Sequence, residues 1–291
     1  MALALDKLGT RYEARTATID VDRARAYAAA INDPNPEYAS GRYAPPVFAV
    51  VPTWDAMMVA LHDVVPAADQ LAMLHAEQDM HFHRPLVPGQ ALVTWAEAYG
   101  LRTSRMGTRF TMRVVSHDDA GALVVEQFAT MLIRGAGDVA DAGQAPPGHA
   151  FPAPARDARV AEVVATIDPD QAVRYAAASG DANPIHVDDE AAKAVGLPGV
   201  ILHGMCTMAL CGRAVIDAVA GGDPTALRRL AVRFYRPVFP GNDLVTSIYD
   251  GGDAGGGRRT YAFEAASAGK VVVRDGRAEV DVPGPRRNGD G

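Results

Sequence analysis

Two long stretches of the chain are apolar enough to be core helices. Residues 199–222 have Arg213 and Asp217 as their only formal charges and end at a glycine pair. An apolar character on every face predicts a helix that is enclosed by its own domain. Residues 47–65 have a similar, less strict pattern, and Pro52 weakens the helix prediction there.

A shorter helix is predicted directly before the second apolar stretch. Asp168 is a suitable N-cap, Pro169 suits the first helical position, and Gly180 is suited to the end of the helix. A turn with the sequence "DANPIH" comes next, starting at Asp181. The chain therefore places polar residues between a short helix and a buried one.

Short β-rich runs, several of them alternating, come after each long apolar stretch. Gly-rich or Pro-Gly turns separate them, which predicts an antiparallel meander. The runs are 71–84, 90–101, 107–118 and 121–134 in the first half, and 227–238, 243–251, 258–267 and 270–282 in the second half. The pattern predicts an α+β fold in which a long helix is enclosed by an antiparallel sheet, twice.

The two halves of the chain repeat one sequence pattern. Asp33 and Asp181 are 148 positions apart (181 − 33), as are Asn35 and Asn183. Further on, "FHRPLVPGQAL" matches "FYRPVFPGNDL" at an offset of 152 (234 − 82). The difference between the offsets indicates one four-residue loop insertion inside a duplicated domain.

The repeat sets the predicted domain organisation. Residues 1–135 and 158–282 form two domains of similar length. Residues 136–157 are rich in Ala, Pro and Gly without periodicity, which predicts a linker, and residues 283–291 predict a disordered tail.

The composition is that of a globular protein. Of 291 residues, 48% are hydrophobic and 22% are charged, and the net charge of −7 argues against a nucleic-acid partner. Cys206 and Cys211 fall on different faces of one helix, so we expect no disulfide between them and a reducing compartment. No signal peptide is recognised at the start, and no run reaches about 20 apolar residues. We predict a cytoplasmic protein without a membrane partner.

The polar turn between the helices contains candidate catalytic residues. Asp181 and Asn183 could be turn residues that bond their own backbone. Asp181 and His186 together, however, could hold a water molecule and pass protons. Gly204, at the start of the apolar helix, offers a backbone N–H that points outward at the positive end of the helix dipole.

These residues carry a family resemblance. Gly180, Asp181, Asn183, Pro184 and His186, followed by "LPGVILHGM", resemble the signature of the MaoC-like, R-specific enoyl-CoA hydratase 2 family. Two-domain members of that family have the double hotdog fold. The resemblance covers most of the chain through the repeat, but the complete motif stands in the second half only.

The resemblance implies an activity and a set of roles. The reaction is the reversible addition of water to a trans-2-enoyl thioester, with acyl-CoA or an acyl-carrier-protein thioester as substrate and without metal or cofactor. Asp181 and His186 are implied to be the catalytic pair, Asn183 a polar partner in substrate binding, and the N–H of Gly204 a donor to the thioester oxygen. Which of the pair acts as base stays open.

The first half departs from the motif. Tyr38 stands where His186 stands in the second half, and "PPVFAVVP" replaces "PGVILHGM". We therefore expect the first half to have lost the chemistry and to serve structure and acyl-chain binding.

Several alternatives remain. The fold would also suit an acyl-CoA thioesterase or a non-catalytic acyl-binding subunit. His81 and His83 alternate onto one strand face and could suggest a metal site, but no third ligand is found at a suitable spacing, and His203 is interpreted as a helix-start residue. Six arginines are candidates for the CoA phosphates: Arg84, Arg213, Arg228, Arg229, Arg233 and Arg236. A monomer and a homodimer are both open, as are chain length and carrier.

Overall fold

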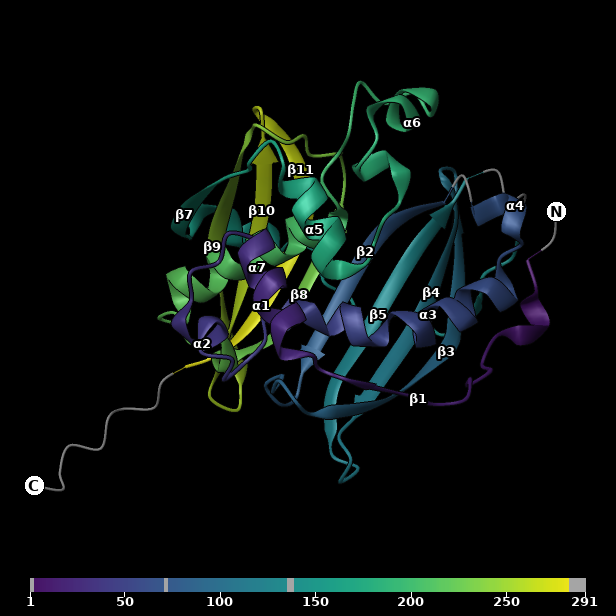
Figure 1. The fold of residues 1–291 in the computed structure, drawn as a ribbon, viewed down its shortest axis with the longest axis horizontal. Helices are drawn as coiled ribbons and strands as arrows, with labels where there is room; N and C mark the ends of the chain where they lie inside the picture. Colours follow the sequence, from purple (N-terminus) through teal and green to yellow (C-terminus); the bar gives the residue numbers. More distant parts are fainter. Residues whose placement is uncertain (1–2, 71–72, 135–138, 283–291) are drawn as a thin grey trace, which may run out of the picture.

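One antiparallel sheet runs through both halves of the chain (Figure 1). The computed structural model describes residues 3–70, 73–134 and 139–282. The strand order is β1-β3-β4-β5-β2-β8-β11-β10-β9-β7, with β6 pairing with β3. The strands are β1 Arg15–Thr18, β2 Met73–Phe82, β3 Ala91–Ser104, β4 Gly107–His117, β5 Leu123–Ile133, β6 Ala142–Gly143, β7 Arg159–Thr166, β8 Leu227–Phe234, β9 Asp243–Gly255, β10 Arg258–Ser267 and β11 Lys270–Asp281.

The two halves meet at the antiparallel pair β2 and β8. Asp79 lies opposite Ala231 in this pair, and the two positions differ by the repeat offset of 152 (231 − 79). Each central residue therefore faces its own counterpart, which places a pseudo-twofold axis at the junction. Across it, the buried guanidinium of Arg229 bonds to the Asp79 carboxylate at 2.7 and 3.0 Å.

The same axis passes between two short helices, α1 (Val21–Ala30) and α5 (Gln171–Ser179), which pack against each other in the middle of the molecule (Figure 1). The hydroxyls of Tyr27 and Tyr175, again repeat counterparts, are 3.0 Å apart. The other helical segments are η1 Leu5–Lys7, α2 Pro36–Ala39, η2 Pro46–Ala49, α4 Ala67–Gln70, η3 Ala153–Asp157, η4 Pro184–His186, α6 Asp189–Ala194 and η5 Pro224–Ala226.

The two long helices are α3 (Val50–Val64) and α7 (Gly204–Val219), one over each half of the sheet. Pro52 falls in the first turn of α3, where its missing N–H would have no helical partner, so the expected weakening does not occur. The expectation that the second half alone encloses α7 is wrong. One side of α7 packs on η2, and both belong to one core.

The segment Pro46–Val64 is long and apolar enough to cross a membrane, by length and composition alone. It covers η2 and α3, and α3 packs on β1, β3 and β4. Because 56% of the segment is buried inside the protein, it has the burial of a core helix.

The strand predictions hold for all eight runs, seven of them with shifted ends, whereas β1, β6 and β7 were not predicted. The start predicted for α5 is wrong, because the helix begins at Gln171, after Asp170. Asp170 is the N-cap residue, and the Asp168 carboxylate instead accepts bonds from Asn32 Nδ2 and Arg174 Nη2. Asp168 thereby ties the two halves together.

The predicted linker packs closely against the sheet over its described part. β6 pairs with β3, and the buried His149 lies 3.2 Å from Glu77 of the first half and 2.7 Å from the Asp275 carbonyl of the second half. Residues 136–138 and the predicted tail at 283–291 lie outside the described residues. Cys206 and Cys211 are both buried free thiols.

Candidate active site

A left-handed residue turns the chain out of α5 into the candidate site. Gly180 ends the helix with φ +85°, a conformation that suits glycine. Arg23 of the first half donates to the carbonyls of Ala178 and Ser179 at 2.9 and 2.6 Å. A cation at the negative end of the helix stabilises it, so the first half holds the end of the helix from which the site begins.

The turn is then fixed by side chains that bond their own backbone. Asp181 Oδ1 accepts from the N–H of Asn183 at 3.2 Å, and Asn183 Oδ1 accepts from the N–H of Ile185 at 3.4 Å. Asn183 is exposed and begins η4, which ends at the buried His186. The turn interpretation of Asp181 and Asn183 is confirmed, and it is compatible with chemistry because the Asp181 carboxylate keeps further acceptor capacity.

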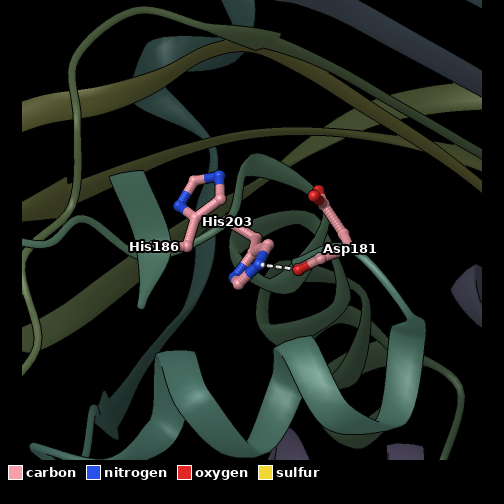
Figure 2. Close-up of side chains that lie close together, drawn as sticks. All are labelled: Asp181, His186 and His203. Atoms are coloured by element: carbon pink, nitrogen blue, oxygen red, sulfur yellow. Dashed lines mark hydrogen bonds between the residues drawn. The ribbon is translucent and has the colours of Figure 1, made fainter. Parts of the chain in front are cut away.

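Three side chains come together beyond this turn: Asp181, His186 and His203 (Figure 2). One polar atom of each lies within 4.8 Å of one polar atom of the other two. The imidazoles of His186 and His203 stack with ring centres 3.8 Å apart. His186 Nδ1 is 2.7 Å from the Ile201 carbonyl, and His203 Nε2 is 2.9 Å from the Asp181 carbonyl.

These contacts define the tautomers of both rings. A carbonyl oxygen only accepts, so Nδ1 of His186 and Nε2 of His203 carry the protons. In the neutral rings, His186 Nε2 and His203 Nδ1 are therefore unprotonated. His203 Nδ1 is buried and has no partner among the described residues.

Burial keeps both imidazoles neutral near pH 7. His186 is 8% exposed and His203 is 1% exposed. Burial lowers the pKa of His186, although its bond to Ile201 and the Asp181 carboxylate act in the opposite direction. Burial, together with the neighbouring His186, lowers the pKa of His203 to about 4. The site thus presents neutral imidazole beside a carboxylate, which is a suitable pair for accepting a proton.

His203 is the residue that the sequence interpretation undervalued. It does precede α7 as expected, but its side chain makes no capping bond to that helix. Instead it contacts both members of the predicted catalytic pair and lies 4.8 Å from the Tyr175 ring. Its place directly before the glycine of "HGM" was the one available signal.

Gly204 is the first residue of α7, so its N–H has no partner within the helix. A Cβ at this position would lie 3.4 Å from the ring of Phe234. The absence of a side chain therefore keeps the backbone accessible between the phenylalanine and the helix start. The residue stands next to His203 in the chain, so the expected N–H donor is beside the expected acid/base pair.

The counterpart in the first half is closed. Tyr38 is 1% exposed, and its hydroxyl has no hydrogen-bond partner among the described residues. Burial raises the pKa of Asp33. Asp33, Tyr38 and Leu227 border a space of about 10 Å³, the lower limit for one water molecule. No substrate fits there as the chain is folded.

Other candidate sites from the sequence find structural roles. His81 lies 3.3 Å from the Asp79 carboxylate, and within the described ranges the group of three or more metal-capable side chains is Asp181, His186 and His203, not one around His81 and His83. The expectation that no metal is bound stays a prediction. Five of the six candidate arginines bond to acidic side chains or carbonyls of the chain itself: Arg213, Arg228, Arg229, Arg233 and Arg236.

A hollow of about 690 Å³ lies along β9 and β10, and its lining residues do not include the site. Glu162, Asp243 and Glu264 line it. Carboxylates repel phosphate groups, so the hollow is a poor match for the CoA nucleotide.

The two halves match two described protein domains. Residues 151–269 match the "MaoC like domain", and residues 6–127 match the "FAS1-like, dehydratase domain region". The chain is 34% identical to 3-hydroxyacyl-thioester dehydratase Y of Mycobacterium tuberculosis over 217 residues, 72% of each chain. It is 33% identical to the peroxisomal enoyl-CoA hydratase 2 of Arabidopsis thaliana over 190 residues, 62% of this chain and 61% of that protein. The Arabidopsis match thus spans less than two thirds of the relative.

Solved structures show the same architecture. A MaoC-like dehydratase from Phytophthora capsici superimposes with a TM-score of 0.86 at 25% identity, over 98% of this chain and all of that one. A Mycobacterium tuberculosis protein described as a double hotdog fold gives a TM-score of 0.59 at 15% identity, over 94% and 96% of the chains. The predicted α+β double hotdog fold is confirmed.

Proposed function

The chain belongs to the family of MaoC-like dehydratases, and on that premise we propose that it is a hydro-lyase acting on enoyl thioesters. The reaction is the reversible addition of water to a trans-2-enoyl thioester, giving the (3R)-hydroxyacyl thioester. The names of the matched relatives support this reaction class. One observation carries the assignment of the site: Asp181 and a neutral His186 lie within 4.8 Å of each other beside the first residue of α7.

The proposed mechanism uses one water molecule between Asp181 and His186. One of the two residues takes a proton from the water while the water oxygen bonds to the β-carbon of the substrate. The unprotonated Nε2 of His186 supports His186 as that base. The double-bond electrons move onto the thioester, and the N–H of Gly204 donates to the oxygen that gains negative charge. The proton that the base took from the water, or one exchanged for it within the Asp181–His186 pair, is then delivered to the α-carbon. This step regenerates the pair and balances atoms and charge.

His203 acts in this scheme as a positioning residue. Its stacking on His186 and its bond to the Asp181 carbonyl fix the two partners relative to each other. Asn183 holds the turn through its bond to Ile185. The acyl-chain role of the first half stays a prediction. A cytoplasmic location is proposed as well, supported by two buried free thiols, and cell fractionation tests it.

The test monitors the enoyl-thioester absorbance of crotonyl-CoA and a longer trans-2-enoyl-CoA, with a free-thiol assay in parallel. We expect loss of the enoyl band without thiol release. Asp181→Asn should lower the rate by about 10²–10⁴-fold, whereas Asp33→Asn, the matched change in the closed half, should leave it near wild type. Thiol release would identify a thioesterase instead. Loss of activity in a well-folded Asp33→Asn but not in Asp181→Asn would refute the site.

A further inference from the structure

One histidine of the first half lies at the candidate site of the second half. His75 is on β2, and its ring centre is 5.1 Å from that of Phe234 on β8. The Phe234 ring faces Gly204, since a Cβ at Gly204 would lie 3.4 Å from it. The Asp181 carboxylate is also near enough to act on the charge of His75. A β-bulge between His75 and Glu77 interrupts the alternation of β2, which lets His75 and Gln78 share the inner face.

A series of hydrogen bonds extends from the half-buried His75 into the buried interior of the first half. His75 Nε2 is 3.0 Å from Gln78 Oε1, Gln78 Nε2 is 3.2 Å from Gln127 Oε1, and Gln127 Nε2 is 3.0 Å from Thr53 Oγ1. The Thr53 hydroxyl donates to the Ala49 carbonyl at 2.8 Å. Gln78, Gln127 and Thr53 are at most 2% exposed.

The bond between Thr53 and Ala49 determines which nitrogen of His75 carries the proton. The Ala49 carbonyl only accepts, so the Thr53 hydroxyl must donate to it, and Thr53 can accept only from the amide NH₂ of Gln127. That orientation turns the oxygen of Gln127 toward the NH₂ of Gln78, and the oxygen of Gln78 toward His75. His75 therefore carries its proton on Nε2, and its Nδ1 is an unprotonated acceptor.

Burial makes this state stable at physiological pH. It lowers the pKa of His75 to about 4, although the hydrogen bonds to Gln78 and to the Glu77 backbone, and the Asp181 carboxylate, act in the opposite direction. The ring is thus a neutral acceptor near pH 7 and not a cation.

The pseudo-symmetry supplies an internal comparison. At the repeat offset of 152, His75 corresponds to Leu227 and Gln78 to Leu230, and both leucines are at most 2% exposed. Leu227 borders the closed space next to Asp33 and Tyr38. The closed site thus has leucines at the two positions where the candidate active site has His75 and Gln78. Burying the polar side chains of Gln78 and Gln127 costs desolvation free energy that leucines would avoid. Because the fold accepts leucines at the equivalent positions, packing alone does not explain why His75 and Gln78 are present.

We propose that His75 is a substrate-binding residue that the first half contributes to the active site, and that its Nδ1 accepts a hydrogen bond from the thioester substrate. This inference rests on the proposed function. The donor is an O–H of the attacking water or the 3-hydroxyl, or an amide N–H of the pantetheine arm. The first half then completes the site rather than only supporting it.

The experiment compares full-length wild type, His75→Phe, His75→Gln and Gln78→Leu, with His62→Asn, an exposed histidine on α3, as the matched control. Steady-state kcat and KM are measured with crotonyl-CoA and with the S-propyl thioester of crotonate, which has no amide. We expect His75→Phe to lower kcat/KM for crotonyl-CoA about 10–100-fold. Its melting temperature should fall no further than that of Gln78→Leu, although the buried Gln78 oxygen loses its partner. His75→Gln, which keeps an acceptor, should recover part of the loss, and Gln78→Leu should fall between His75→Phe and wild type.

The two thioesters distinguish the donors. An equal loss on both identifies the reacting O–H, and a loss on crotonyl-CoA alone identifies the amide. Wild-type kcat and KM in His75→Phe would overturn the inference, as would a loss that only tracks a lowered melting temperature without rescue by Gln. If wild type shows no turnover, the proposed function is refuted, and calorimetry of crotonyl-CoA binding then tests the His75 contact by itself. Unchanged affinity of His75→Phe for crotonyl-CoA would refute that contact.

Discussion

The turns after α1 and α5 fold in the same way, although only the second ends at an imidazole. Asp33 Oδ1 accepts from the N–H of Asn35 at 3.0 Å, as Asp181 Oδ1 does from Asn183 at 3.2 Å. In both turns the asparagine side chain then caps the next helical segment. The shared Asp-x-Asn-Pro sequence is therefore sufficient for the turn, and the proposed chemistry depends on the residues beyond it.

Beyond the shared turn, the two sites differ at four equivalent positions. By sequence, His186, His203, Gly204 and His75 correspond to Tyr38, Val50, Val51 and Leu227. Of the latter, Tyr38 and Leu227 border the closed space. Because β2 and β8 cross the junction, each half contributes a strand residue to the site of the other half. The candidate active site is therefore built by both halves, and its polar side chains stand on one side of the pseudo-twofold axis only.

The largest effect is expected where the first half lacks the imidazole of His186, at Tyr38. Tyr38→His combined with Asp181→Asn should stay at least about 10²-fold below wild type, no faster than Asp181→Asn alone. Valines still stand where the candidate active site has His203 and Gly204, and the space beside Tyr38 is about 10 Å³. Enoyl-band kinetics on both variants measure this, with circular dichroism to verify folding.

Tyr38→His alone serves as the control and should keep the wild-type kcat/KM. Recovery of hydration in the double variant would show that the first half is open to substrate, contrary to its packing.

The sequence predicts the architecture well because the repeat doubles each weak signal. The eight strand runs and both long helices recur at matched positions, and Asp181, His186 and Gly204 stand close together in the chain. His75 and Gln78 could not be found in this way, because they reach the site through the β2–β8 junction, which no local pattern encodes. Asp168 was misassigned for the same reason, since its partner Asn32 lies in the other half.

The two sites also differ in how their stability should depend on pH. Burial lowers the pKa of His75 and of His203 to about 4 each, and the closed site has no histidine at the matched positions. A histidine with a lowered folded pKa binds fewer protons in the folded state than unfolded. Its contribution is therefore full above pH 6.5 and falls as the pH drops toward 4, by up to about 1.4 kcal/mol per pH unit.

Urea unfolding at pH 7, 6 and 5 of wild type and His203→Asn measures this contribution. We expect the free energy of unfolding of wild type to fall more steeply than that of the variant, by about 1–2 kcal/mol over this range. His149 changes stability with the opposite sign, since its raised pKa gives stability at low pH that is lost as the pH rises. Because both proteins retain His149, it cancels in the difference. Parallel slopes would contradict the burial of His203 as a neutral ring.

The smallest expected effect compares two buried tyrosine hydroxyls. The hydroxyl of Tyr27 bonds to Tyr175 at 3.0 Å, so Tyr27→Phe leaves a buried hydroxyl unpaired and should cost about 1–2 kcal/mol of unfolding free energy. The hydroxyl of Tyr38 has no partner among the described residues. Tyr38→Phe should therefore be neutral or stabilise by up to about 1 kcal/mol. Denaturant unfolding at pH 7 measures both changes. If Tyr38→Phe lowered the free energy of unfolding by more than about 1 kcal/mol, a water molecule would have to bond this hydroxyl. The closed site would then be hydrated, as the candidate active site is proposed to be.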